Sequence, residues 1–89
     1  MAVCAGSGGA LFAKASMSNV ADILVTGEAS HHEQLDLVAR GATIITAGHS
    51  VTERGYLAQC LRPWLQREIR PSIPIDVASA DAEPGVYTL

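Results

Sequence analysis

Three strand-length apolar runs are spaced along the first half of the chain, at residues 2–5, 22–26 and 43–46. The second run is β-branched and does not alternate with polar residues, a pattern typical of a strand that is covered on both faces of a parallel sheet. The intervening segments are long enough to return each strand parallel to the last, so helical crossovers are predicted between the strands.

Two of the predicted helices lie in these crossovers. Residues 10–15 have helix-forming composition and follow a glycine-rich turn at residues 6–9. The second helix is predicted to begin at Ser30, whose spacing from Glu33 is that of a capping box. It is predicted to end at Gly41, because glycine is favoured directly after the last helical residues.

A third helix is predicted between residues 50 and 69, where apolar residues recur at steps of three or four and form one stripe. The stripe comprises Leu57, Leu61, Trp64 or Leu65, and Ile69. Pro63 interrupts the pattern, because it lacks the N–H group that would bond the carbonyl of Gln59. A kink or break is therefore predicted at this proline.

Pro71 and Pro74 are predicted to end the third helix, and a last strand is predicted at residues 73–78. The acidic, proline- and glycine-containing residues 79–89 predict a poorly ordered tail. The predicted fold class is therefore α/β, a three-layer arrangement of a mostly parallel sheet of about four strands with three helices, within one lobe at residues 1–78.

The charge, hydropathy and cysteine content of the chain limit the kinds of partner that it is expected to bind. Six Lys and Arg against nine Asp and Glu give a net charge of −3 and a pI near 5.4, which argues against direct nucleic-acid binding through charge. No apolar run approaches the ~20 residues of a membrane span, so no membrane partner and a cytoplasmic location are predicted, with mitochondrion and nucleus as alternatives. Cys4 and Cys60 lack the spacing of a zinc knuckle or disulfide framework and are predicted to be buried thiols.

The polar residues that can carry chemistry follow the predicted strands. Glu28, His31 and His32 come after the second strand, and His49 and Glu53 come after the third. Functional residues of parallel sheets gather outside the carboxyl ends of the strands. These side chains are therefore predicted to converge on one edge of the sheet.

His49 and Glu53 are four residues apart across a strand-to-helix turn. An imidazole and a carboxylate at this spacing can meet one divalent ion, and mixed nitrogen and oxygen ligation suits Zn, Mn, Fe or Ni. Glu53 also has the spacing of a capping-box partner for Ser50, in which case His49 is an ordinary turn residue. The spacing alone favours the capping interpretation.

His31 and His32 fall in the first turn of a predicted helix, where the helix dipole favours the neutral imidazole that can bind metal. Adjacent side chains point in different directions, so the two rings are not expected to bind one ion together. They are either an exposed hydrogen-bonding pair or part of the surroundings of an active site. Glu28, at the end of the preceding strand, is placed to hydrogen-bond and orient an imidazole.

The sequence Gly6-Ser7-Gly8-Gly9 precedes a helix and can present backbone N–H groups to an anion. It departs from the GxGxxG pattern, since Leu11 stands where the third glycine belongs, and it lacks the GK[ST] of a Walker loop. Close packing between strand and helix is the favoured explanation of these glycines.

Three blocks occur in order along the chain: Val3-Cys4-Ala5-Gly6-Ser7-Gly8, Thr26-Gly27-Glu28-x-Ser30-His31-His32, and Gly48-His49-Ser50-x-Thr52-Glu53-Arg54-Gly55. Together they resemble the carboxyl-terminal half of the NIF-three-like family, whose bacterial members are labelled GTP cyclohydrolase type-two homologues. The resemblance runs from residue 2 to about residue 77. It implies an α/β fold with two related lobes, a dinuclear metal centre between the lobes and toroidal homo-oligomers.

The resemblance also assigns site residues. It implies that His49 and Glu53 are two ligands of a divalent metal, with the other ligands in the family's amino-terminal half. The missing amino-terminal lobe is therefore an expected partner, and the metal site is expected to be incomplete in this chain. His31 and His32 match a block of the carboxyl-terminal half, so they are expected near the metals without necessarily binding them.

Two functions are compatible with this resemblance. The first is a metal-dependent hydrolase of a nucleotide-like or phosphorylated small molecule, in which Glu28, His31 and His32 are catalytic residues that orient groups or transfer protons. The second is a non-enzymatic interaction or regulatory protein, in which metal and oligomerisation are structural and the partner is another protein. This chain alone is expected to be inactive as an enzyme, because it holds half of the implied site.

Overall fold

The computed structural model describes residues 1–69 and 72–82. The elements follow in the order β1 (Ala2–Ser7), α1 (Gly9–Lys14), the 3₁₀ turn η1 (Met17–Asn19), β2 (Ile23–Glu28), α2 (His31–Ala39), β3 (Thr43–Thr46), α3 (His49–Tyr56), the π-helical turn η2 (Leu57–Leu61) and α4 (Arg62–Glu68). The chain divides into two compact units, Met1–Glu53 and Arg54–Leu89. None of the helices in the described ranges is long and apolar enough to cross a membrane.

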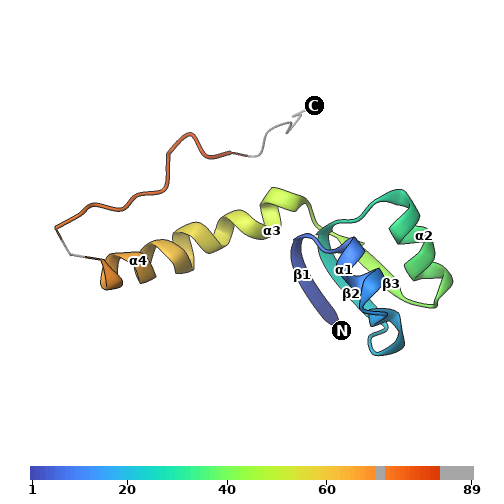
Figure 1. The fold of residues 1–89 in the computed structure, drawn as a ribbon. Helices are drawn as coiled ribbons and strands as arrows, with labels where there is room; N and C mark the ends of the chain where they lie inside the picture. The colour runs from blue at the N-terminus through green and yellow to red at the C-terminus, as the bar shows by residue number, and fades with distance from the viewer. Residues whose placement is uncertain (70–71, 83–89) are drawn as a thin grey trace. The chain divides into compact units, whose positions relative to one another are not determined.

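The first unit contains a parallel sheet with the strand order β1-β2-β3 (Figure 1). The register aligns Ala2 with Leu24, and Leu24 with Ile44. Because neighbouring strands are parallel and consecutive in the sequence, each connection crosses over through a helical segment, as the apolar pattern predicted. The α/β fold class is confirmed.

A single hydrophobic core joins this sheet to helices α1 and α2. Phe12 of α1 and Leu37 of α2 are buried with Leu24 of the central strand, and Ala21 and Ala42 complete the core. Right-handed crossovers between strands in the order β1-β2-β3 place both helices on the same face, which explains why the two helices share one core.

Local sequence signals set the ends of α2 as predicted. The Ser30 hydroxyl accepts a hydrogen bond from the Glu33 N–H at 3.3 Å, and the Glu33 carboxylate accepts one from the Ser30 N–H at 2.7 Å. Gly41 follows the helix with φ +91°, a conformation that favours glycine. The predicted capping box and the terminating glycine are both confirmed.

In the second unit the helix does not break at Pro63 but changes from a π-helical turn to an α-helix just before it. Leu57–Leu61 form a π-helical turn, and α4 begins immediately afterwards with Pro63 in its first turn. Proline is tolerated in the first turn of an α-helix, where its missing N–H would have no partner in the helix. The π-helical turn therefore introduces the irregularity just ahead of the proline.

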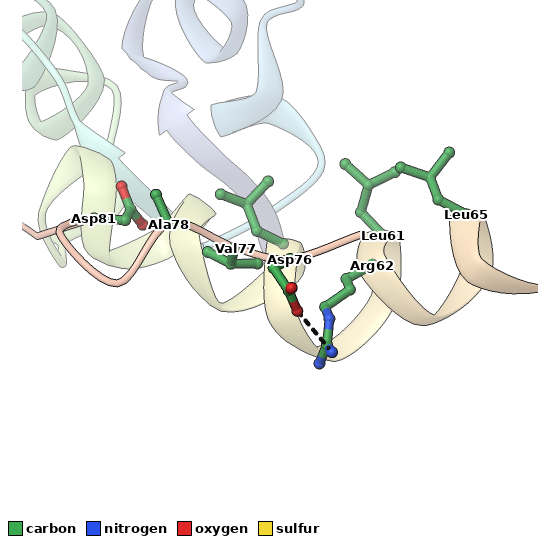
Figure 2. Close-up of a pocket in the computed structure, with 8 residues that line it drawn as sticks. Leu61, Arg62, Leu65, Asp76, Val77, Ala78 and Asp81 are labelled. Carbon is green, nitrogen blue, oxygen red and sulfur yellow. Dashed lines mark hydrogen bonds and ion pairs between the residues drawn. The ribbon is translucent and has the colours of Figure 1, made fainter. Parts of the chain in front are cut away.

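The apolar stripe predicted for this helix lines a groove of about 310 Å³ (Figure 2). Three leucines, Leu57, Leu61 and Leu65, line it together with Val77 from the segment that follows the helix. Arg62 and Asp76 also line the groove and form an ion pair, with Arg62 Nη2 3.1 Å from Asp76 Oδ1.

Residues 73–78 do not form the predicted fourth strand, and the sheet of the described residues has three strands. Helix side chains bond the carbonyls of this segment instead. Arg62 Nε donates to the Ile75 carbonyl at 2.8 Å, and Gln66 Nε2 donates to the Ile73 carbonyl at 3.1 Å. These carbonyls are therefore not available to a neighbouring strand, and Pro74 lacks the N–H that a ladder would use.

Two further predictions concern the thiols and the tail. Cys4 is partly buried but Cys60 is exposed, so the prediction of a buried thiol is wrong for Cys60. Cys60 lies between Leu57 and Leu61 in sequence but off the apolar stripe that lines the groove. The predicted poorly ordered tail at residues 79–89 lies outside the described residues from residue 83 onward.

Candidate functional site

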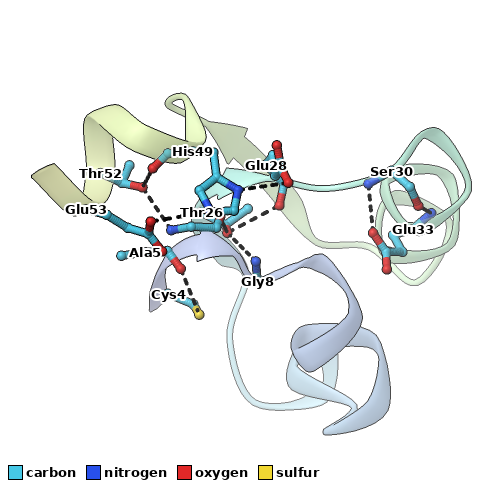
Figure 3. Close-up of polar contacts among 11 residues, drawn as sticks. Cys4, Ala5, Gly8, Thr26, Glu28, Ser30, Glu33, His49, Thr52 and Glu53 are labelled. Atoms are coloured by element: carbon cyan, nitrogen blue, oxygen red, sulfur yellow. Dashed lines mark hydrogen bonds and ion pairs between the residues drawn. The ribbon is translucent and has the colours of Figure 1, made fainter. Parts of the chain in front are cut away.

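Glu28, His49 and Glu53 meet at the carboxyl end of the sheet (Figure 3). His49 Nδ1 lies 2.9 Å from Glu28 Oε1, and His49 Nε2 lies 3.4 Å from Glu53 Oε2. The imidazole therefore stands between two carboxylates. The three side chains are between 42% and 55% exposed, so solvent and small ligands have access to the cluster.

Strand pairing explains why residues so distant in sequence meet. Thr26 of β2 pairs with Thr46 of β3, and the hydrogen-bond ladder continues beyond β3 until the Gly48 N–H donates to the Gly27 carbonyl at 2.8 Å. The chain therefore leaves β3 alongside the last residues of β2. As a result, the first residue of α3 lies next to the last residue of β2.

Helix α3 begins at His49, and this start tests the capping interpretation of the turn. The carbonyl of Gly48 accepts the first helical hydrogen bond, from the Thr52 N–H at 3.2 Å. Ser50 is therefore already inside the helix and cannot be the N-cap that a capping box requires. The capping interpretation of Ser50 and Glu53 is therefore wrong. Because His49 and Glu53 are four residues apart in α3, the Glu53 side chain lies beside His49, one helical turn along.

Gly6, near the end of β1, packs directly against the His49 and Glu53 side chains. A Cβ atom at this position would contact Glu53 Oε1 and would lie 3.0 Å from Glu53 Cδ and 3.3 Å from His49 Nε2. Gly6 also has φ +66°, which strains any residue with a side chain. The backbone of β1 therefore forms one wall of the site, and only glycine leaves space for the two side chains.

Thr52 connects this wall to the first turn of α3. Its hydroxyl accepts a hydrogen bond from the Gly6 N–H at 2.9 Å and donates one to the His49 carbonyl at 2.8 Å. Both partners are backbone groups of the site, so Thr52 fixes the separation of β1 and α3. Thr52 was not predicted from the sequence to be a functional residue. Its only sequence signal was its place between His49 and Glu53 in the third block.

Thr26 performs a similar role beneath the glycine-rich turn. Its buried hydroxyl donates to the Gly6 carbonyl at 3.0 Å and accepts from the Gly8 N–H at 2.9 Å. A Cβ atom on Gly8 would lie 2.6 Å from Thr26 Oγ1, and one on Gly9 would lie 2.6 Å from Ala29 Cβ. The prediction that these glycines permit close packing is confirmed. Thr26 itself was not selected from the sequence.

His31 and His32 lie in the first turn of α2, as predicted, and their rings contact each other with centroids 5.7 Å apart. Among the described residues, no ion pair joins either ring to Glu28 or Glu53. Both side chains are exposed at the start of the helix. The structure therefore does not bring this pair into direct contact with the two carboxylates.

The donor atoms of His49 and Glu53 have the separation expected for two ligands of one ion. Bonds of about 2.1 Å from a metal to nitrogen and oxygen, at a tetrahedral angle, place the two donors about 3.4 Å apart. The observed separation of Nε2 and Oε2 is 3.4 Å. Over residues 1–69 and 72–82, however, no group of three or more His, Cys, Asp or Glu side chains is arranged to hold a metal. The geometry therefore fits two ligands and not a complete coordination sphere.

Comparison with known proteins identifies the family. The family description Duf34/NIF3 (NGG1p interacting factor 3) matches residues 1–84. NIF3-like protein 1 of Dictyostelium discoideum is 39% identical over 84 residues, and NGG1-interacting factor 3 of Saccharomyces cerevisiae is also 39% identical over 84 residues. Protein NIF3 homolog of Schizosaccharomyces pombe is 39% identical over 87 residues. Each match covers 94% of this chain.

The chain spans between 23% and 30% of the length of these three relatives. No solved structure shows a significant match to it. The family match includes the whole sheet and all the residues of the site, so the resemblance of the three sequence blocks is confirmed. The chain belongs to the Duf34/NIF3 family.

Proposed function

We propose that this chain supplies two ligands, His49 Nε2 and a Glu53 carboxylate oxygen, to a divalent metal centre of a Duf34/NIF3 protein. The observation that carries the proposal is the 3.4 Å separation of these donors, at a position where Gly6 has no side chain to displace them. An imidazole nitrogen and a carboxylate oxygen together suit Zn, Mn, Fe or Ni. The remaining ligands are expected from outside the described part of the chain.

The activity that fits such a centre is hydrolysis of a nucleotide-like or phosphorylated small molecule. A divalent ion supplies Lewis-acid chemistry for such reactions when it is bound. In this chain, Glu28 bonds the ring of His49 and holds it in place. The exposed imidazoles of His31 and His32 are the groups available for proton transfer to or from a substrate.

Zinc binding to the chain and to two variants tests the metal proposal. We expect weak binding of at most one ion per chain, because two protein ligands leave most of the coordination sphere to water. His49→Ala and Glu53→Gln are each expected to abolish it while helix content by circular dichroism stays the same. Asp36→Asn is a matched control, because within residues 1–69 and 72–82 the Asp36 carboxylate pairs with Arg40 alone, at the surface of α2. Unchanged zinc content in both site variants, or two tight ions per chain, contradicts the proposal.

Phosphate-release and ring-opening assays on the metal-loaded two-lobe protein test the hydrolase assignment, because this chain alone is expected to be inactive. Product formation that depends on zinc and is lost in His49→Ala supports it. Metal binding without turnover on nucleotides or phosphorylated small molecules contradicts the enzymatic assignment and leaves the metal site in place.

A second candidate function is protein interaction or regulation, with the metal and oligomerisation as structural features. The Saccharomyces cerevisiae relative is named as an interacting factor of NGG1, and this name favours a protein partner. The sheet also ends in an edge strand, β1, on which Val3 is 68% exposed. An exposed edge strand favours pairing with another chain. Analytical ultracentrifugation tests self-association, and a folded monomer at high concentration contradicts it.

A further inference from the structure

We infer that Glu28 is a positioning residue that holds the neutral His49 ring with its proton on Nδ1, so that Nε2 is the nitrogen directed toward Glu53. The inference rests on the proposed metal function and assigns Glu28 one of the two roles that the sequence left open. Glu28 orients the imidazole and is neither a metal ligand nor a proton-transfer group.

The two distances around the ring favour this tautomer. The 2.9 Å between His49 Nδ1 and Glu28 Oε1 is that of a good hydrogen bond from an N–H to a carboxylate. The 3.4 Å between His49 Nε2 and Glu53 Oε2 is longer than the usual range. A neutral imidazole carries one proton, and of these two contacts the shorter one, to Glu28, is the better place for it.

The position of the Glu28 backbone is fixed by strand pairing, although its side chain is exposed. Glu28 is the last residue of β2, and its backbone is paired with Ser7 of β1. The strand therefore fixes the Cα position from which the carboxylate reaches the ring. Glu33, a further carboxylate in the segment that follows β2, instead accepts a hydrogen bond from the N–H of Ser30 in the capping box.

The position of Glu28 also excludes it from the ion that His49 and Glu53 would share. Nδ1 and Nε2 lie on different edges of the imidazole, and Glu28 contacts the Nδ1 edge. Gly6 and Glu53 lie at the Nε2 edge. A carboxylate that accepts a hydrogen bond from the second nitrogen of a metal-bound histidine fixes its tautomer and ring orientation. Loss of such a partner typically weakens metal binding by about 10- to 100-fold.

Nitrogen-15 NMR of the imidazole rings tests the inference on the 89-residue chain without metal. The chain has three histidines, so the His49 signals are identified by their absence in His49→Gln. In alkaline buffer we expect the proton of His49 on Nδ1. Glu28→Ala should release this preference, whereas Glu28→Gln, which keeps an acceptor oxygen, should retain most of it. Asp36→Asn is the matched control, because in the part of the chain that the structure describes its carboxylate pairs with Arg40 and not with the site, and it should change nothing.

Zinc titration of the same samples supplies the second measurement. Glu28→Ala should weaken zinc binding by about 10-fold or more without lowering the melting temperature, and Glu28→Gln should recover part of the loss. A proton on Nε2 in the unsubstituted chain, or unchanged zinc affinity in Glu28→Ala, overturns the inference while the metal proposal stands. The expected tautomer with no response to zinc overturns the metal proposal and leaves the orienting role of Glu28 intact.

Discussion

Substitution of Gly6 by alanine tests whether the wall formed by β1 controls the candidate metal site. Gly6 has φ +66°, and the left-handed conformation costs a residue with a Cβ atom about 1–2 kcal/mol. The added Cβ would also lie 3.0 Å from Glu53 Cδ and 3.3 Å from His49 Nε2. Both effects act at the site, but we expect them to appear in different measurements.

The contact with Glu53 should displace the side chain rather than unfold the protein. The Glu53 side chain is 52% exposed, so it can rotate into solvent at little cost. We therefore expect Gly6→Ala to lower the free energy of unfolding by about 1–2 kcal/mol, mainly through the backbone term. The melting temperature should fall by about 4–8 °C for each kcal/mol in a domain of this size.

We expect Gly6→Ala to lower the zinc affinity much more than the free energy of unfolding. Rotation of Glu53 away from His49 removes one of the two donors. Loss of a group that merely orients a ligand costs about 10–100-fold in affinity, so the loss of a ligand should cost at least about 10-fold. Zinc titration followed by the His49 ring signals in NMR measures this change in a range of weak affinities.

Gly41→Ala is the matched control. Gly41 has φ +91°, outside the left-handed range of L residues, so alanine has at least as much backbone strain there, but a Cβ atom would meet nothing within 4 Å. We expect at least as large a loss of stability by urea unfolding and no loss of zinc affinity. Zinc binding by Gly6→Ala equal to that of the unsubstituted chain would refute the steric reasoning. An equal loss of zinc affinity in both variants would show that the effect follows global stability and not the contact with Glu53.

Three further substitutions separate the supports of the site from the stability of the fold. Thr26→Val removes a buried hydroxyl that bonds two backbone groups of the glycine-rich turn, so urea unfolding should show a loss of about 1–3 kcal/mol, with a smaller loss in Thr26→Ser. Thr52→Val removes the connection between β1 and α3, so zinc affinity should fall, and Thr52→Ser should restore it. Ser30→Ala removes the N-cap of α2, so thermal unfolding should show a loss of about 1 kcal/mol while zinc affinity is unchanged.

The sequence predicted the parts of the fold that depend on near neighbours. Ser30 and Glu33 are three residues apart, and their capping box formed as predicted because both partners belong to one helical turn. The strands were predictable because their apolar runs lie between clear helical segments. The segment at residues 73–78 has a similar composition, but its carbonyls are bonded by side chains of the preceding helix, a tertiary interaction that composition does not encode.

The candidate site was predicted in part for the same reason. His49 and Glu53, four residues apart across a predicted strand-to-helix turn, could meet one ion. Glu53 also had the capping-box spacing from Ser50, and only the start of α3 at His49 excludes that alternative. Glu28 was expected to orient an imidazole, yet the sequence could not say which one. Strand pairing selects His49. Thr26 and Thr52 were missed because their hydroxyl partners lie 20 and 46 residues away along the chain.

For the proposed metal site, these supports imply that the number of donors, rather than their preorganisation, limits the affinity. The β1 wall, the Thr52 bridge and the Glu28 hydrogen bond all act on the same pair of ligands. A tight site needs three or four protein ligands, whereas the described residues place two donors around one position. A third donor from another segment should therefore raise the metal affinity far more than a more rigid arrangement of His49 and Glu53 would. Each added ligand replaces a water molecule, and the positions of the two present donors are already fixed. The matched relatives are more than three times as long as this chain, and their additional length is where we expect such donors.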